Sequence, residues 1–341
     1  MLRSADAQFN AADFEPAVAK YKAILEQPAD ASIEENTLYR LAVTYHNMKD
    51  YEASSNTFRT LLEKFPQGAH KAEAHFRIAE HLLRDAGDAV NAIEQYQAAL
   101  ESSPDGDLAG RALRGLALSR YERKDYDMAA ELFQRLINEY PGVPLNEEAY
   151  AWLGERLFDQ QNWAAAAAVF EALLKAVPGY PYPEMVRFKI AECREKAGNP
   201  GEALQLYEKV VEAAPASAKA VEAQYRMAVL YEAQNEPDKA LQLYEIAANA
   251  NTGDVAARAR FRLGELYEAK NEHDKAARSY MRVAILFLHP ELSPEALWRA
   301  GQCFEKTGNP EQAAKTYQEI ISDYPDNARV PEAKDAIARL G

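Results

Sequence analysis

One pattern recurs along the whole chain: a small residue is followed four positions later by an aromatic ring. The nine pairs are Ala17/Tyr21, Ser54/Phe58, Ala92/Tyr96, Ala129/Phe133, Ala166/Phe170, Ala203/Tyr207, Ala240/Tyr244, Ala276/Tyr280 and Ala313/Tyr317. Successive pairs are separated by 36 to 38 residues. A fixed period of this length indicates one supersecondary unit repeated many times. Because such a unit buries its apolar face only against its neighbours, the repeat constrains the fold more than the length of 341 residues does.

Before each small/aromatic pair except the first, the sequence contains another amphipathic segment. It contains an apolar residue followed by Ala or Gly, at Leu41-Ala42, Ile78-Ala79, Leu116-Ala117, Leu153-Gly154, Ile190-Ala191, Met227-Ala228, Leu263-Gly264 and Ala300-Gly301. Aromatic residues one turn later, such as Tyr45 and Tyr231, complete a 3.6-residue period. Each unit is therefore predicted to be a helix, a turn and a second helix. The small residue of each pair is expected where the two helices approach most closely.

The turn between the two helices has its own chemistry. Lys-Asp-Tyr occurs at 49–51 and 124–126, and Gly-Asn-Pro occurs at 198–200 and 308–310. Side-chain oxygens of Asp and Asn accept hydrogen bonds from the free amides of a helix start, which predicts N-caps at Asp50, Asp125, Asn199 and Asn309. The prolines that follow, Pro200 and Pro310, suit the first helical position. Glu202 and Gln312 have the spacing of a capping box.

Proline also marks the end of most second helices. The stops are Phe65-Pro66, Ser103-Pro104, Tyr140-Pro141, Val177-Pro178, Ala214-Pro215, His289-Pro290 and Tyr324-Pro325. A helix usually ends at or before the residue that precedes proline. The seventh unit has Asn251-Thr252-Gly253 instead.

The order Leu/Gly, aromatic, turn, Ala, aromatic and Pro resembles the tetratricopeptide repeat over nearly the entire chain. The fifth unit matches it best, with Tyr150, Leu153, Gly154, Ala166, Phe170 and Pro178. This resemblance implies an all-α fold, a right-handed superhelical α-solenoid of helix-turn-helix repeats. The units are longer than the usual repeat of the family. Residues 1–325 are expected to form nine repeats of about 37 residues, the first truncated at its N-terminus, and residues 326–341 a C-terminal capping helix.

Long units with Tyr-Pro endings are similar to the Tol–Pal coordinator and outer-membrane assembly lipoprotein families of the bacterial envelope. The resemblance implies a non-enzymatic scaffold or adaptor for protein–protein interaction in a bacterial cell-envelope assembly, in the periplasm or associated with the envelope. A cytoplasmic adaptor or co-chaperone-like protein without a carboxylate clamp is the alternative. A third possibility, an all-α enzyme, would require a bound cofactor or a cluster of perturbed carboxylates.

In this family the first helices line the concave face, so a partner protein or peptide is expected to bind there. Aromatic residues recur just before the Leu/Gly pair, at Tyr39, Phe76, Phe188, Tyr225, Phe261 and Trp298, with a break at Arg114 and Ala151. A basic series follows at Arg40, Arg77, Lys189, Arg226, Arg262 and Arg299, and carboxylates follow one turn later at Glu80, Glu155, Glu192 and Glu265. The predicted groove binds a peptide or helix with apolar anchors and Lys or Arg side chains.

Two plainer interpretations of the same residues stay open. Each aromatic can pack against the neighbouring first helix, and Arg77/Glu80, Lys189/Glu192 and Arg262/Glu265 have the spacing of ordinary surface ion pairs.

The net charge, the apolar runs and the N-terminal sequence limit which partners and which compartment are expected. The formal net charge of -14, with no Lys/Arg stripe, disfavours nucleic acid. No long uncharged apolar run is present, so no membrane span is expected. The sequence opens inside a helix of a repeat without a leader-like segment, which is expected of a piece of a longer protein whose Met1 is a cloning start.

The chain lacks the residue patterns of catalysis, a metal site or a cofactor site. It contains no Gly-rich phosphate loop, no GxSxG and no HExxH. His70, His75 and His81 have gaps that scatter their rings around a helix, so no metal site is expected. Cys193 and Cys303 fall at a small, inward position of their first helices and are expected to be buried, inert thiols. The sequence therefore predicts no catalytic residue, cofactor or enzyme activity, and it leaves the oligomeric state open.

Overall fold

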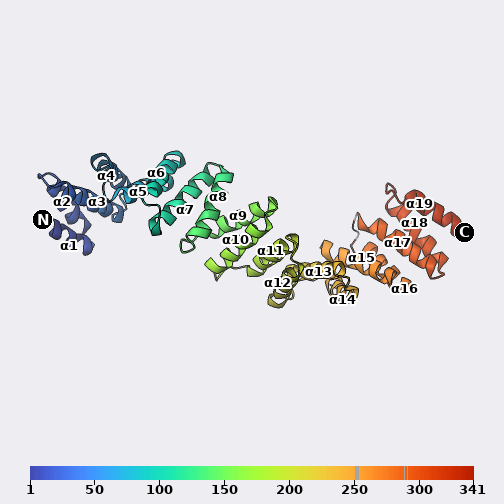
Figure 1. The fold of residues 1–341 in the computed structure, drawn as a ribbon. Helices are drawn as coiled ribbons and strands as arrows, with labels where there is room; N and C mark the ends of the chain where they lie inside the picture. Colours follow the sequence, from blue (N-terminus) through green and yellow to red (C-terminus); the bar gives the residue numbers. More distant parts are fainter. Residues whose placement is uncertain (250–252, 288, 290) are drawn as a thin grey trace. The chain divides into compact units, whose positions relative to one another are not determined.

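The computed structural model describes residues 1–249, 253–287, 289 and 291–341, and every regular element in these residues is a helix (Figure 1). In chain order the helices are α1 (Leu2–Asn10), α2 (Phe14–Leu25), α3 (Ala31–Asn47), α4 (Tyr51–Lys64), α5 (Lys71–Arg84), α6 (Ala89–Ser102), α7 (Gly106–Glu122), α8 (Tyr126–Glu139), α9 (Glu147–Asp159), α10 (Trp163–Ala176), α11 (Pro183–Lys196), α12 (Pro200–Ala213), α13 (Ala218–Ala233), α14 (Pro237–Ala248), α15 (Gly253–Ala269), α16 (His273–Phe287), α17 (Leu292–Lys306), α18 (Pro310–Asp323) and α19 (Val330–Leu340).

The helices group into two compact units, unit 1 at Met1–Leu153 and unit 2 at Gly154–Gly341. Within each unit, a helix packs mainly on the helices before and after it in the sequence. First helices of successive hairpins also touch, as α5 touches α7 in unit 1 and as α13 touches α15 in unit 2. This is the nearest-neighbour packing of a solenoid, and it confirms the predicted all-α solenoid fold within each unit. The division into nine repeats and a capping helix, and the right-handed superhelix, stay predictions.

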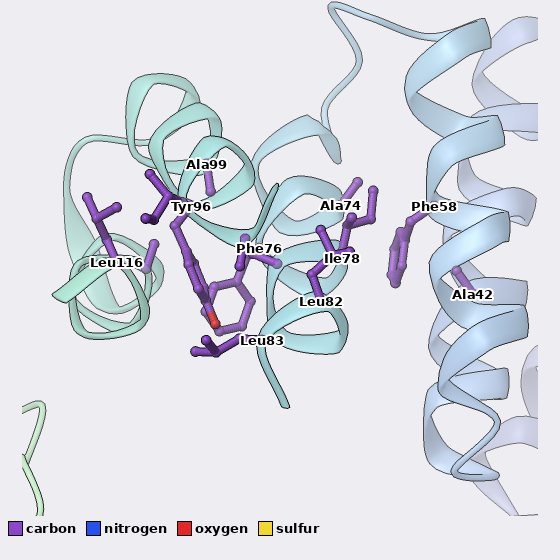
Figure 2. Packing of buried hydrophobic residues seen from close by; sticks show 14 of the residues in the cluster. Ala42, Phe58, Ala74, Phe76, Ile78, Leu82, Leu83, Tyr96, Ala99 and Leu116 are labelled. Atoms are coloured by element: carbon purple, nitrogen blue, oxygen red, sulfur yellow. The ribbon is translucent and has the colours of Figure 1, made fainter. Parts of the chain in front are cut away.

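The small residues are buried where they were expected. Ala17, Ala92 and their counterparts through Ala313 have no exposed surface, and Ser54 has 3%. The Ser54 hydroxyl donates a hydrogen bond to the carbonyl of Ala42 at 2.9 Å, so the polar member of the series is satisfied. In unit 1, Phe58, Phe76 and Tyr96 fill the space between successive helices of one continuous apolar core (Figure 2).

Glycine in the first helix makes room for the aromatic ring of the second. A Cβ atom on Gly154, Gly264 or Gly301 would lie only 2.5, 2.4 or 2.3 Å from the ring four residues after the small position of the same hairpin. Real Cβ atoms do not approach that closely, so the helices of these hairpins are packed at a distance that an alanine would increase.

The turns between paired helices depend on one residue in the left-handed region. Lys49, Lys124, Gly198 and Gly308 have φ angles of +63°, +63°, +80° and +73°, each directly before an N-cap residue. Helices α12 and α18 then begin at Pro200 and Pro310, which confirms the predicted position of these prolines.

The predicted capping bonds form only in part. Asp50 Oδ1 accepts a hydrogen bond from the amide of Ala53 at 3.1 Å. Asp125, Asn199 and Asn309 occupy N-cap positions, but their side chains make no capping bond, so that part of the prediction is wrong. Competing partners hold two of them: Arg120 Nη1 donates to Asp125 at 3.0 Å, and the Asn309 amide donates to Thr307 Oγ1 at 3.0 Å.

The capping boxes expected with Glu202 and Gln312 consequently do not form, because each requires the missing N-cap bond. Glu202 instead lies 3.3 Å from Arg194.

The second helices end where proline predicted. Helices α4, α6, α8, α10, α12 and α18 each end two residues before their proline. The stops predicted at Pro290 and at Asn251-Thr252 lie outside the described residues.

Candidate first-helix interaction face

The predicted aromatic series packs against the second helix of its own hairpin. Each ring lies beside the aromatic ring of the small/aromatic pair, with centroid distances of 6.2 Å for Tyr39–Phe58, 6.0 Å for Phe76–Tyr96, 5.3 Å for Phe188–Tyr207, 5.7 Å for Tyr225–Tyr244, 5.3 Å for Phe261–Tyr280 and 5.1 Å for Trp298–Tyr317. Tilted rings at these distances attract one another beyond their shared burial. The series is therefore part of the hairpin core.

The following hairpin covers most of these rings from the other side. The His70 imidazole stacks on Tyr39 with ring centroids 3.9 Å apart, and the Arg111 guanidinium lies 4.4 Å from the centroid of Phe76. In unit 2, Lys219, Arg299 and Arg329 lie over Phe188, Phe261 and Trp298 at 4.4, 5.8 and 5.3 Å. A cation over a ring face is attracted by the ring electrons, so each contact joins one hairpin to the next.

This burial corrects two of the predicted contact residues. Phe76 and Phe188 are 1% and 0% exposed, so they have no surface to offer a partner and are packing residues. Tyr39, Tyr225, Phe261 and Trp298 are half-buried and keep one edge at the surface.

The basic series pairs with carboxylates of the preceding hairpin. Arg226 donates to Glu192 and to Glu195, both at 3.3 Å. Arg299 lies 3.6 Å from both Glu265 and Glu268. The spacing of these residues predicts pairs only within one helix, and these also form, with Arg262 donating to Glu265 at 2.9 Å. The charges of the first-helix face are thus largely satisfied by one another.

In unit 2, buried tyrosines of the second helices also donate hydrogen bonds to carboxylates of the first helices. The hydroxyl of Tyr207 donates to Glu195 at 2.7 Å, and equivalent bonds join Tyr244 to Glu232, Tyr280 to Glu268 and Tyr317 to Glu305. Burial raises the pKa of Tyr207, and the neighbouring Glu195 raises it further, so the hydroxyl stays a donor. Burial also raises the pKa of Glu192, against the effect of Lys189 and Arg226.

The sequence contains a signal for this bond that the predicted series of aromatic, basic and acidic residues does not include. Tyr at 207, 244, 280 and 317 is preceded twelve residues earlier by Glu, whereas Phe at 58, 133 and 170 is preceded at that distance by His46, Tyr121 and Phe158. In these seven hairpins a hydroxyl occurs with a carboxylate and a ring without a hydroxyl occurs with another ring, whereas Tyr21 and Tyr96 have Phe9 and Arg84 at that distance.

Where the predicted series breaks, unit 1 presents a different aromatic surface. Tyr121, Tyr126 and Trp152 form what we call the Tyr121 cluster, with centroids 4.9 Å apart for Tyr121–Trp152 and 5.6 Å for Tyr121–Tyr126. Tyr121 and Tyr126 are 38% and 37% exposed. The cluster comes from the end of α7, the start of α8 and helix α9. The periodicity within one helix does not predict this cluster, because its members belong to three different helices.

The first-helix face of unit 1 is also hollowed. A cleft of about 280 Å³ receives side chains from the first helices α3, α5 and α7 and from the second helix α4. Its lining residues are His46, Tyr51, Ser54, Arg77, Glu80, His81, Arg84, Asp85 and Arg111. Arg77 donates to Glu73 at 2.7 Å, while the side chain of Arg84 is 66% exposed. The cleft therefore offers hydrogen-bond donors and acceptors from successive repeats.

The histidines and cysteines are held in separate surroundings. His75 Nδ1 lies 2.7 Å from Gln95, and His81 Nδ1 lies 3.1 Å from Asp85. Within the described residues, no three His, Cys, Asp or Glu side chains are grouped as a metal ion would need.

The two cysteines are buried, as predicted. Cys193 and Cys303 are 1% and 0% exposed, and burial raises the pKa of each thiol to about 11. In the part of the chain that the structure describes, no helix combines the length and apolarity of a membrane span.

Solved structures are similar to this chain at low sequence identity, and one of them has a TM-score above 0.5. A structure of Naa15/Naa10 bound to HypK-THB covers 87% of this chain and 43% of its own, with 16% identity and a TM-score of 0.59. The C-terminal part of a TPR repeat-containing protein from Cytophaga hutchinsonii covers 76% of this chain and 99% of its own, with 18% identity and a TM-score of 0.42. A crystal structure of MamA protein covers 54% of this chain and 94% of its own, with 22% identity and a TM-score of 0.43.

Family models give the more specific result. No curated protein matches the chain. One tetratricopeptide repeat model matches residues 39–107, 105–144, 114–181, 153–218 and 225–290, and a second matches residues 295–327. These matches include well over half of the sequence and fall on the helix pairs described above. The chain therefore belongs to the tetratricopeptide repeat family.

Proposed function

We propose that the protein is a non-enzymatic scaffold that binds a peptide or helix of a partner protein on the face formed by its first helices. The observation that carries the proposal is the cleft of unit 1, where three successive first helices supply side chains to one hollow. A chain that runs across such a face would meet equivalent positions of consecutive repeats. Side chains that already bond across hairpins hold this surface in a fixed arrangement, which lowers the entropy cost of binding.

The contact residues that we propose are the members of the predicted set that keep some surface. They are the surface edges of Tyr39, Tyr225, Phe261 and Trp298, and the polar side chains of Arg226, Arg262, Arg299, Glu192 and Glu265. Of these, Arg262 has the most accessible basic side chain, at 45%. In unit 1 we propose the exposed Arg84 and the Tyr121 cluster as further contact residues. Exposed Tyr, Trp and Arg side chains are the types that most often dominate protein–protein binding energy.

The experiment is a pull-down from the native host with two matched double variants. Arg84→Glu with Arg262→Glu changes the first-helix face, whereas Arg59→Glu with Lys209→Glu makes the same charge change at exposed positions of the second helices α4 and α12. We expect the partner to be lost from the first variant and retained by the second. Circular dichroism checks that both variants remain folded. Retention of the partner by both variants, or its loss from both, would contradict the proposal.

A bacterial cell-envelope assembly remains our proposed setting, with a cytoplasmic adaptor as the alternative. It is supported by the long repeat units and their Tyr-Pro endings. Fractionation of the native host, with detection of the full-length gene product, tests it.

A further inference from the structure

The repeat provides an internal comparison for the surface of the second helices. Five and six residues after the aromatic of each pair, the chain has Glu26-Gln27, Glu63-Lys64, Glu101-Ser102, Asn138-Glu139, Lys175-Ala176, Glu212-Ala213, Asn249-Ala250 and Ser322-Asp323. Every one of these pairs contains at least one polar residue, and none contains a large apolar one. In α16 alone the two positions carry Ile285 and Leu286.

Both apolar residues of α16 face solvent. Ile285 is 63% exposed and Leu286 is 52% exposed. Single exposed apolar residues are common on protein surfaces, but two adjacent ones need an explanation at positions where every other hairpin has only polar residues or alanine. The preceding second helix, α14, also has an exposed apolar residue: Ile246, at the position equivalent to Arg282, is 51% exposed.

Two arginines precede the apolar pair on the same face of α16. Arg278 and Arg282 lie seven and three residues before Ile285, a helical spacing, and both are exposed. Among the described residues, neither forms an ion pair with a carboxylate. Asp274, one turn before Arg278, is the nearest acidic residue along the helix.

A third arginine lies near Arg282. Arg260 of α15 is 5% exposed, and its burial, together with the nearby charge of Arg282, lowers its pKa. The exposed surface of α16 therefore carries two arginines in a chain whose formal net charge is -14, whereas α18 has Glu319 and Asp323 at the positions equivalent to Arg282 and Leu286. Because the rest of the chain is acidic, the charge here is complementary to an acidic partner and opposite to the molecule's own average.

We propose that this surface, defined as Arg278, Arg282, Ile285 and Leu286 and called here the α16 face, binds an acidic amphipathic helix of a partner protein. Leucine-type side chains of that helix would cover Ile285 and Leu286, and its carboxylates would pair with Arg278 and Arg282. The α16 face is separate from the first-helix face of the proposed function, so either proposal can fail while the other holds.

The test measures binding of a fluorescent synthetic helix with Leu on one face and Glu on the other by anisotropy. A matched helix with Lys in place of Glu is the charge control. We expect the Leu/Glu helix to bind the full chain and the Leu/Lys helix to bind far more weakly.

Two independent variants locate the site. Ile285→Asn with Leu286→Ala introduces the residues that the sequence has at the equivalent positions 249 and 250, and Arg278→Gln with Arg282→Gln removes the charges. Each should weaken binding by about tenfold or more, because both types of contact are needed. Lys209→Gln with Glu212→Gln, at exposed positions of α12, is the matched control and should leave binding unchanged.

Three results would overturn the proposal. The first is equal affinity in all variants. The second is binding of phosphatidylglycerol vesicles, but not of the Leu/Glu helix, in a manner that depends on Arg278 and Arg282, which would assign the face to lipid. The third is self-association in analytical ultracentrifugation that Ile285→Asn with Leu286→Ala abolishes, which would make a second copy the occupant.

Discussion

Single carboxylates at the ends of the first helices serve two partners at once in unit 2. Glu195 accepts from the hydroxyl of Tyr207 in its own hairpin and from Arg226 in the next. A hydrogen bond to an ionised acceptor is stronger than one between neutral groups, and the surrounding burial strengthens it further. One side chain thereby fixes both the packing inside a hairpin and the register between hairpins.

Removal of a single hydroxyl should show how much this arrangement stabilises the fold. We expect Tyr207→Phe to lower the free energy of unfolding by about 1–2 kcal/mol, because Glu195 keeps Arg226 but loses its buried donor. The shift of the urea midpoint measures the change. Tyr182→Phe is the control, since Tyr182 is 58% exposed and should give no shift. An equal midpoint for Tyr207→Phe and the wild type would contradict this account.

The two thiols should be unreactive in the folded chain. Their pKa of about 11 keeps them protonated below that pH, and only the thiolate attacks a disulfide reagent. At pH 8 we expect Cys193 and Cys303 to react with an aromatic disulfide reagent only after urea is added. Ser322→Cys places a thiol at an exposed position and should react at once. Rapid reaction of either native thiol would show that its first helix opens readily.

At the scale of the element, the hairpin turn requires one residue with positive φ. Glycine adopts this conformation without a steric penalty, whereas a residue with a Cβ is disfavoured by about 1 kcal/mol. The chain places Gly198 and Gly308 at this position in two hairpins but Lys49, Lys124, Gln161, Asn235 and Asn271 in others. The turns are therefore unequal in strain, although their geometry is shared.

Introducing glycine at this turn position and removing it should change the free energy of unfolding in opposite directions. We expect Lys124→Gly to raise the free energy of unfolding by about 0.5–1 kcal/mol, and Gly198→Ala to lower it by a similar amount. Thermal unfolding followed by circular dichroism measures both. Lys315→Gly, at an exposed interior position of α18, should be destabilising, which separates the turn effect from a general effect of glycine. Destabilisation by Lys124→Gly would refute the strain argument.

At the scale of the whole molecule, stability is a sum over neighbours. From α10 to α19 each helix contacts the next one in sequence, and contacts between first helices reach one hairpin further. A destabilising substitution in one hairpin therefore lowers the stability of the adjacent hairpins and has little effect beyond them. In the single core of a globular domain, by contrast, the whole domain would be destabilised.

Overpacking of the last hairpin should reveal this locality. Ala313 of α18 has no exposed surface and belongs to the cluster that includes Tyr317, Ala333 and Ala336. Ala313→Leu should destabilise this cluster by about 1–3 kcal/mol. Hydrogen exchange with mass spectrometry should show lost protection in α17, α18 and α19 and unchanged protection in α11 and α12. Loss of protection throughout unit 2 would indicate one cooperative core instead.

The period, the helices, the turns and the small/aromatic contact could all be predicted from the order of the residues. These features depend on residues of the same hairpin, such as Ala203 and Tyr207, whose spacing is fixed by helix geometry and recurs in every unit. The prolines at 200 and 310 and the stops before Pro66 or Pro325 are local for the same reason: the restriction acts on the adjoining backbone.

Which of the predicted contact residues remain at the surface depended instead on the packing of whole hairpins. Phe188 and Phe261 are the same residue type at the same place in their helices, yet Phe188 is fully buried while Phe261 keeps an exposed edge. Different side chains of the following hairpin lie over them, Lys219 over Phe188 and Arg299 over Phe261. The pairing of Arg226 with Glu192 and Glu195, the Tyr121 cluster, and the exposure of Ile285 and Leu286 likewise depend on how one hairpin lies on the next. Side chains compete for partners across that contact, and a pattern along the chain does not record which partner is within reach.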